Sequence, residues 1–585
     1  MSLAQYDNPV KWRYKIPTSI VLAILSFLTS FSLASDHRDL FFEDLYIKPL
    51  NDGKLFAHFQ FKTIYRKDIG SLRWENNFQL FPLSIAELVA SADLDELHFS
   101  LTKGNWNSHD WGYLSSSSPP GAQIRVQLSR YNESPDRSWR RLINSLAGKF
   151  CTSLVSADEK TLVKTRIAFR HNFSSLPNST RQHLYANLPE GTFCTENLTP
   201  WKKLLPCHSS SGLASLLNAV NILKSSYSSL SIDIEPLSNI SDSSDSVQLT
   251  QLLTVVFNPL LLFEGKQTWS LSKLFGNNIH YKCPVASHSR IHVDITNLDQ
   301  SAKLYPNSYV EHKVVRKIST SSAETRTYAV YDINSILGNS TQMNKAQFNL
   351  GIKQNQLFKR TSESIKYKTP IDLKTHVAGL NGREGTIVAN IANNHDQPVR
   401  VNYMDVLPYF LRVYLHTLTI RTSSRQELRP DQLNFALSKD VTPTLIELSM
   451  VIPPASSAQI SYEFERAFLR WTDYKPDANK GILIGSAMVS FSFEPRLQHL
   501  AFPIKAMDSD TELKIHDPEI QVVYAKPLLI ILPMPDLSMP YNVICLVCTV
   551  VVIAIGQLHN MTTTKPMIRV KKQRTEKVEE KDVIG

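Results

Sequence analysis

The chain has 585 residues, of which 42% are hydrophobic and 20% are charged. This balance is typical of a globular protein with a sizeable core, and it excludes a disordered, collagen-like or small disulfide-dense protein. The length corresponds to several domains. The formal net charge of +10 is carried partly by the two ends and is otherwise thinly spread, whereas nucleic-acid binding needs Lys and Arg concentrated on one surface. We therefore predict no nucleic-acid partner.

The first 34 residues have the pattern of a secretory signal peptide. A basic stretch at residues 11–15 precedes an apolar run at residues 20–33, and Ser32 and Ala34 supply the small residues of a cleavage site. The apolar run is shorter than the about 20 residues that a membrane span needs. We therefore predict cleavage after Ala34 rather than an N-terminal signal anchor.

The body from residue 35 to residue 282 mixes strands and helices. Apolar and polar residues alternate through residues 55–61, after the turn residues Asn51, Asp52 and Gly53, which predicts a β-hairpin. Helical spacing then follows at Ile85, Leu88 and Val89. Further helices are predicted at residues 138–150 and 212–224. This half is predicted to be an α+β lumenal domain.

Strand-like segments predominate from residue 283 to residue 538. They follow one another at short intervals, as in "RIHVDIT", "GTIVANIAN" and "AQISYEFERAFLRW". Such spacing predicts mainly antiparallel β-sandwich packing in this second lumenal region. The Ser- and Asp-rich residues 238–246 predict a surface loop or linker within the first region.

The C-terminal segment predicts a membrane anchor. Residues 539–559 are almost wholly apolar and about one bilayer long, with no polar face. The following residues 560–585 carry several Lys and Arg, so the positive-inside rule assigns this tail to the cytosol and the body to the lumen. A GPI-attachment signal would end at the apolar segment. The prediction is a single-pass type I membrane protein.

A lumenal body predicts N-glycosylation. Sequons that lack a following proline begin at four asparagines of the body, namely Asn172, Asn178, Asn239 and Asn339. At Asn132 and Asn197 a proline follows the acceptor triplet, and we expect those two sites to be used less.

Catalytic motifs with explicit mechanics are missing from the lumenal sequence. It has no GxSxG, HExxH, Walker A, strand-linked GxGxxG or paired CxxC motif. Ser270 to Lys273 read SxxK without the companion motifs of that chemistry, so a solvated helix start is the favoured interpretation. His292 and Asp294 share one face of a predicted strand, but no third ligand is visible, and we interpret them as a surface pair. We predict no catalytic residues, no metal and no cofactor.

The segment "CTENLTPWKKLLPC", residues 194–207, is the most unusual of the chain. It holds two of the four lumenal cysteines, a sequon, Trp201 and two prolines. One interpretation is an internal disulfide between its ends, and the other is an exposed loop that offers a thiol and an aromatic to a partner. The four lumenal cysteines allow three internal pairings or a bridge to another chain. Spacing alone does not choose among these.

Long strings of this sequence resemble the PIG-T family of GPI transamidase subunits. They are "CTENLTPWKKLLPC", "YEFERAFLRWTDYKPDANKG", "PDLSMPYNVICLVCTVV", "DLYIKPLNDGKLFAHFQF", "ELHFSLTKGNWNSHDWG" and "LRVYLHTLTI". The resemblance extends from the mature N-terminus to the predicted span. It is poorest in the Ser/Asp loop, around residues 301–326 and in the tail.

The resemblance implies a non-catalytic scaffold in the endoplasmic reticulum membrane complex that attaches GPI anchors to precursor proteins. The catalytic Cys and His would belong to a caspase-like partner, PIG-K, bound through an interchain disulfide from Cys194. Cys207 and Cys283 would then be a plausible internal pair, with Cys151 free. Further implied partners are GPAA, PIG-S and PIG-U type subunits and membrane lipid or GPI. Bulk features alone leave two alternatives: a type I lumenal or cell-surface receptor or adhesion protein, and a hydrolase with an unrecognised site.

Overall fold

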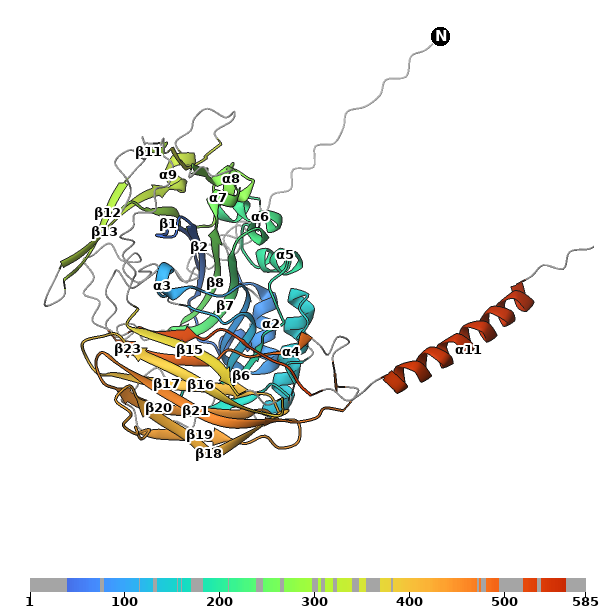
Figure 1. The fold of residues 1–585 in the computed structure, drawn as a ribbon. Coiled ribbons are helices and arrows are strands. Elements are labelled where there is room, and N and C mark those ends of the chain that lie inside the picture. The colour runs from blue at the N-terminus through green and yellow to red at the C-terminus, as the bar shows by residue number, and fades with distance from the viewer. Residues whose placement is uncertain are drawn as a thin grey trace, which may run out of the picture.

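The computed structural model describes a sheet-rich body and one separate C-terminal helix, which Figure 1 shows extending away from the body. The described residues are 39–73, 78–114, 116–129, 134–154, 156–158, 160–169, 183–208, 210–237, 246–262, 268–296, 303–306, 311–318, 323–338, 347–353, 369–379, 382–470, 473–474, 480–493, 519–533 and 538–563. The predicted signal peptide and most of the predicted cytosolic tail lie outside them.

The first unit is built on an 11-stranded sheet of order β12-β13-β10-β1-β2-β8-β7-β3-β4-β6-β5. All neighbours are antiparallel except β1 and β10, which run parallel. The predicted hairpin is β1 with β2. The strands are β1 (Leu40–Pro49), β2 (Leu55–Tyr65), β3 (Leu94–Lys103), β4 (Gly121–Leu128), β5 (Val163–Thr165), β6 (His183–Leu188), β7 (Tyr227–Leu237), β8 (Ser246–Phe257), β10 (His288–Asp294), β12 (Glu311–Ile318) and β13 (Ala323–Asp332).

Helices cover one side of this sheet, and Figure 1 shows α2, α4, α5 and α6 following one another along it. α2 buries Ile85, Leu88 and Val89 at the helical spacing seen in the sequence. The helical elements are η1 (Ser71–Arg73), α2 (Leu83–Ala92), α3 (Ser108–Trp111), α4 (Pro135–Phe150), α5 (Thr195–Lys203), η2 (Leu213–Leu216), α6 (Ala219–Leu223), α7 (Pro259–Leu262), α8 (Leu271–Phe275) and α9 (Ile333–Gly338). A small sheet joins β11 (Lys303–Tyr305), β14 (Gly351–Lys353) and β9 (Trp269–Ser270).

The single helix predicted at residues 212–224 is two short helices in the structure, η2 and α6. The chain turns at Leu217 into extended backbone, and the Asn218 side chain accepts a hydrogen bond from the Val220 N–H to start α6. Asparagine favours such an N-cap over a helix interior, because its side chain competes for backbone groups.

The second unit is a β-sandwich whose two sheets share one apolar core. The first sheet has the order β15-β16-β21-β18 and the second β19-β20-β17-β23-β24, with β22 and β25 as a separate pair. Alternating inward residues of both sheets fill the core between them. The strands are β15 (Ile371–Ala378), β16 (Glu384–Asn393), β17 (Val399–Leu407), β18 (Leu411–Thr422), β19 (Gln432–Ala436), β20 (Thr444–Ile452), β21 (Ser456–Arg466), β22 (Ile482–Ile484), β23 (Met488–Phe493), β24 (Glu519–Tyr524) and β25 (Leu528–Ile530).

This architecture confirms the predicted fold class, but the change from the first unit to the second does not fall at residue 283. Strands β10, β12 and β13 all follow that residue and still belong to the 11-stranded sheet. β10 pairs with β1, although most of the first unit lies between these two strands in the sequence, and the register places Phe42 opposite His288. The sandwich strands begin only at Ile371. Local periodicity cannot reveal such long-range pairing, and the predicted boundary was therefore too early.

The C-terminal helix α11 (Ser538–Thr563) contains the predicted span of residues 539–559. Its 26 residues have a mean hydropathy of 2.2 over the most apolar window, and none of them is buried against the body. Among the described residues it is the one helix long and apolar enough to cross a membrane. The charge-free helix is thus exposed along its whole length, as a helix surrounded by lipid would be.

The two units meet through a small apolar cluster and a set of buried hydrogen bonds. Phe169 and Tyr185 of the first unit pack with Met404 and Met488 of the sandwich. The buried carboxylate of Glu447, on β20, accepts hydrogen bonds from three consecutive backbone N–H groups of residues 166–168. The body therefore has a polar and well-defined contact between its units.

Candidate partner interface around Cys194

Cys194 begins a helix rather than a loop. It is the N-cap of α5, and both its backbone N–H and its thiol lie within hydrogen-bond distance of Asn197 Oδ1, at 2.8 and 3.0 Å. This reciprocal arrangement is a capping box, which satisfies N–H groups that a helix start leaves without partners. Cys194 is a free and partly exposed thiol.

Asn197 fixes this helix start to the end of α4. Its side chain is buried, and Nδ2 donates to the carbonyl of Phe150 at 2.8 Å and to that of Cys151 at 3.4 Å. Cys151 is the left-handed C-cap of α4, with φ 52°, and its thiol is free and exposed. One buried amide thus holds two thiol-bearing helix ends next to each other.

The aromatic of this segment is not offered to a partner. Trp201 is fully buried, its indole N–H donates to the Ser231 carbonyl of β7 at 3.1 Å, and its ring meets that of Phe61 edge-on. Gln251 of β8 donates to the Trp201 carbonyl at 3.1 Å. The hypothesis of an exposed loop with a presented aromatic is therefore wrong, because this tryptophan attaches α5 to the sheet.

The outward face of α5 is polar. Thr195, Glu196, Thr199 and Lys203 are exposed beside the Cys194 thiol. Lys202 is half-buried, donates from Nζ to the Leu217 carbonyl at 2.8 Å, and has a pKa lowered by burial. A partner that reached Cys194 would meet a rigid polar helix face, positioned by Asn197 and Trp201 from behind.

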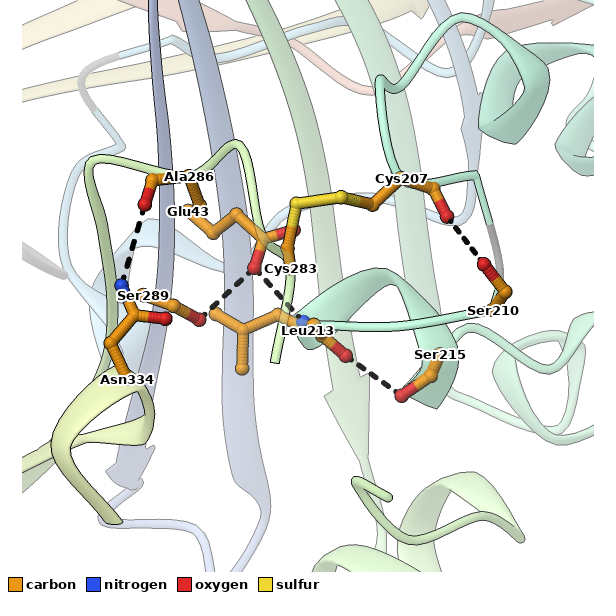
Figure 2. Close-up of a disulfide and its surroundings, with 10 residues drawn as sticks. Glu43, Cys207, Ser210, Leu213, Ser215, Cys283, Ala286, Ser289 and Asn334 are labelled. Carbon is orange, nitrogen blue, oxygen red and sulfur yellow. Dashed lines mark hydrogen bonds between the residues drawn. A yellow bond between two sulfur atoms is a disulfide. The ribbon is translucent and has the colours of Figure 1, made fainter. Parts of the chain in front are cut away.

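The other end of the segment is held by a disulfide. Cys207 is bonded to Cys283, with the Cα atoms 5.9 Å apart, and Figure 2 shows the bridge between the chain after α5 and the chain before β10. The bond ties the α5 segment to the strand that pairs with β1. The internal pairing of Cys194 with Cys207 is not the one that the structure contains.

A buried carboxyl lies beside this disulfide. Glu43 of β1 accepts hydrogen bonds on Oε2 from the Leu213 N–H at 3.1 Å and from the Ser289 hydroxyl at 3.0 Å, as Figure 2 shows. Gly212 has φ +66°, and a Cβ there would lie 2.4 Å from Glu43 Oε2. Burial raises the pKa of Glu43 to about 7, and the charge of the adjacent Asp44 raises it further.

Glu43 should make the stability of the protein fall as the pH rises from about 4.5 to 7. The unfolded carboxyl loses its proton in this range while the folded one keeps it, so the folded state binds more protons and loses stability with each pH unit, by about 3 kcal/mol in total. Asp44 does not change this expectation. Burial opposes its ionisation, but hydrogen bonds from His288 and His292 hold its pKa well below the usual range. The stability that ionised Asp44 contributes is therefore lost only at pH values below 4.5.

The measurement is the urea midpoint of the full chain in mild detergent at several pH values between 4.5 and 7.5. Glu43→Gln, which keeps the side-chain shape but does not titrate, should flatten the decline. Equal slopes for the two proteins would show that Glu43 does not carry this pH dependence.

The other singled-out residues are structural in their surroundings. His292 is buried and pairs through Nε2 with Asp44 Oδ1 at 3.0 Å, and Asp294 is buried as well, so the predicted surface pair is wrong. Ser270 is the buried N-cap of α8 and accepts from the Lys273 N–H, so this helix start is not solvated as predicted. Over the described ranges, no group of three His, Cys, Asp or Glu residues is arranged to hold a metal.

The four favoured sequon asparagines lie outside the described residues, so Asn172, Asn178, Asn239 and Asn339 remain predictions. Asn197 is described, and its side chain is buried and engaged in the capping box. Sequence reasoning missed this role. The signal that could have shown it is the spacing C-x-x-N at a helix start, where the fourth residue of a capping box returns to the N-cap.

These features define a class: a sheet-rich, two-unit protein with a partly exposed thiol at the start of a helix that buried residues hold in place, and with a C-terminal helix apolar enough to cross a membrane. The model of the Gpi16 family, described as "Gpi16 subunit, GPI transamidase component", matches residues 22–264 and 259–584. The chain therefore belongs to the Gpi16 family, which confirms the resemblance to PIG-T proteins.

Relatives of known name align along nearly the whole chain. The human GPI-anchor transamidase component PIGT is 34% identical over 564 residues, which cover 94% of each chain. The GPI transamidase component GPI16 of Saccharomyces cerevisiae is 26% identical over 557 residues, covering 89% of this chain and 87% of that protein. Among solved structures, the match to the collagen-binding subdomain of the Enterococcus faecalis surface protein ACE covers 27% of this chain and 96% of that subdomain, with 7% identity and a TM-score of 0.17. A TM-score this low supports no argument about the fold.

Proposed function

We propose that this chain is a non-catalytic scaffold subunit of a GPI transamidase, and that it stabilises a caspase-like catalytic subunit of the PIG-K type. Family membership and full-length similarity to named transamidase components support a role in that complex. The catalytic Cys and His belong to the partner in this proposal. The receptor or adhesion alternative has no comparable support, since it does not account for the family match.

The observation that carries the covalent part of the proposal is the state of Cys194. Its thiol is free and partly exposed, on a helix start that Asn197 holds from the buried side. Cys207 and Cys283 are already bonded to each other, so neither is available to another chain. Disulfide exchange needs an accessible thiol. Cys151 is also free and exposed; the resemblance to PIG-T proteins favours Cys194 over it, and we assign the interchain disulfide to Cys194.

The proposed topology has the body in the lumen of the endoplasmic reticulum, residues 539–559 of α11 in the membrane, and residues 560–585 in the cytosol. The length and hydropathy of α11 support a span. Its fully exposed surface leaves room for transmembrane helices of GPAA, PIG-S and PIG-U type subunits and for lipid or GPI. Signal cleavage after Ala34 and glycans on Asn172, Asn178, Asn239 and Asn339 belong to the same proposal.

The covalent link is tested on a non-reducing gel of the complex in mild detergent. We expect the wild type to give a heavy band that disappears on reduction and contains a caspase-like protease by mass spectrometry, and we expect Cys194→Ser to lose that band completely. The matched control is Cys151→Ser, which removes the neighbouring exposed thiol and should keep the band. A band that persists in Cys194→Ser, or disappears in Cys151→Ser, would refute the assignment to Cys194.

A further inference from the structure

A cavity of about 500 Å³ lies between the two units. The first unit contributes residues from the chain after α4, from β6 and from the turn that follows β6. The sandwich contributes residues at and after the end of β17, Pro443, Leu469, Asp473 and the chain around β22. Its volume falls within the about 300–1,000 Å³ of ordinary small-ligand sites, which often form at domain interfaces. The cavity is distinct from the disulfide of Figure 2, since neither Cys207 nor Cys283 lines it.

Asn187 is a buried side chain whose hydrogen-bonding groups have no partner. It is 9% exposed, and neither its Oδ1 nor its Nδ2 makes a hydrogen bond. Alternation along β6 turns Leu184 and Ala186 toward the helix-covered core and leaves Asn187 on the opposite face, in the cavity wall. Buried amides are almost always hydrogen-bonded, because leaving them unpaired costs free energy.

Ser486 repeats this arrangement from the other unit. It is 6% exposed, it lines the cavity, and its Oγ has no hydrogen-bond partner. The adjacent Gly485 lets the sandwich backbone approach closely, since a Cβ there would lie 3.2 Å from Asn187 Nδ2. One donor-acceptor pair from Asn187 and one hydroxyl from Ser486 therefore converge from two units.

The remaining wall offers aromatic surface and, with Lys160, Asp473 and Glu190, one excess negative charge. Tyr409 and Phe410 line the cavity, with their rings 5.6 Å apart in an edge-on arrangement. Lys160 lies 5.9 Å from the Tyr409 ring and is paired with Asp473 at 3.7 Å. Because Asp473 offsets Lys160 and Glu190 leaves one excess negative charge, the wall disfavours an anion. An uncharged ligand with several hydroxyl groups fits better, since hydroxyl groups can donate hydrogen bonds to a carboxylate.

We propose that this cavity binds a neutral sugar ring, such as a hexose or an N-acetylhexosamine. Adjacent ring hydroxyls donate and accept at once, which matches the paired Oδ1 and Nδ2 of Asn187 and the hydroxyl of Ser486. The apolar faces of the ring pack on Tyr409 and Phe410. An extended peptide fits less well, because it needs a long groove or an open strand edge, whereas this half-open cavity has a volume of about 500 Å³. This inference does not depend on the proposed transamidase role.

The test uses the full chain in mild detergent with glucose, galactose, mannose and N-acetylglucosamine as probes. Binding is measured by saturation-transfer NMR and by the rise in melting temperature with sugar concentration, since a ligand that binds the folded state stabilises it. We expect at least one of these sugars to bind the wild type and its binding constant to fall at least tenfold in Asn187→Leu. The matched control, Asn278→Ala, removes an asparagine that also has an unpaired Oδ1 but lies outside the cavity, and should bind as the wild type does.

Two further readouts separate binding from a structural role. Without sugar, Asn187→Leu should melt no lower than the wild type, because it removes polar groups that have no partner. Ser486→Ala, a smaller change, should also weaken binding. Failure of all four sugars to bind the wild type, unchanged binding in Asn187→Leu and Ser486→Ala, or tighter binding of an uncharged peptide than of any sugar would each overturn the proposal. Saturation by free sugar identifies the ring itself as the ligand, and tighter binding of a glycoprotein or glycolipid that carries the same ring would assign the larger source.

Discussion

Replacing Glu447 by Ala should lower the free energy of unfolding by about 3–5 kcal/mol, the range found when one partner of a buried charged interaction is removed. The carboxylate has no exposed surface and accepts from the N–H groups of Arg166, Ile167 and Ala168 at 3.0–3.3 Å. Asn434 adds a fourth hydrogen bond at 2.7 Å. Truncation would leave all four donors without this acceptor in a buried contact.

The urea midpoint of the full chain in mild detergent measures this effect. Glu447→Gln should lower the free energy of unfolding by less than Glu447→Ala, because glutamine keeps one acceptor oxygen. It should still be less stable than the wild type, because its NH₂ group would face N–H donors. The matched control is Glu463→Ala on β21, the next strand along the chain, where the side chain is exposed, and a change within about 0.5 kcal/mol is expected. A Glu447→Ala midpoint equal to that of the control would mean that the contact between units does not contribute to stability.

The reason for a large effect is the position of these groups in the fold. Residues 166–168 follow β5 at the edge of the 11-stranded sheet, and Glu447 lies inside the second sandwich sheet. Asn402 and Ser490 of the sandwich bind the carbonyls of the same segment. The sandwich thus provides hydrogen-bond partners for both the N–H groups and the carbonyls of residues 166–168. Losing Glu447 therefore weakens the contact between the two units rather than a local surface interaction.

Local patterns in the sequence predict the parts of this fold that local interactions decide. The β1–β2 hairpin pairs over its whole length around a turn with Gly53 at φ 80°, and α2 buries one face at helical spacing. The apolar run at the C-terminus likewise forms one helix. In each case neighbouring residues along the chain supply the hydrogen bonds and the periodicity, so a short window is sufficient.

The parts that sequence reasoning missed depend on residues far apart in the chain. β10 joins β1 and moves the unit boundary past residue 283. Trp201 looks like an exposed aromatic in its polar segment, but β7 and β8 supply its hydrogen bonds. The cavity wall joins Asn187 to Ser486, almost three hundred positions apart in the printed sequence. No spacing rule connects such residues, whereas the cysteine and the asparagine of the capping box are close enough to be found.

Removing the bond between Cys207 and Cys283 should cost about 4 kcal/mol of unfolding free energy in the chain-entropy description of disulfides. The two cysteines are 76 residues apart, so the bond restricts a long loop of the unfolded chain. That loop contains η2, α6, β7, β8 and α8, and its closure brings the end of the α5 segment to the start of β10. The doubly substituted Cys207→Ser/Cys283→Ser chain should therefore unfold at a clearly lower urea concentration than the wild type.

The cysteines of the chain provide the controls for this experiment. Cys151→Ser and Cys194→Ser remove thiols that are unpaired within the chain, so in the isolated subunit both should unfold close to the wild type. The double variant keeps Cys194, and a heavy reducible band should still form in the complex, though in lower yield because less of the chain is folded. Wild-type stability in the double variant would contradict the structural role of this bond. Loss of stability in Cys194→Ser alone would instead mean that Cys194 supports the fold, which would argue against its assignment as the contact to another chain.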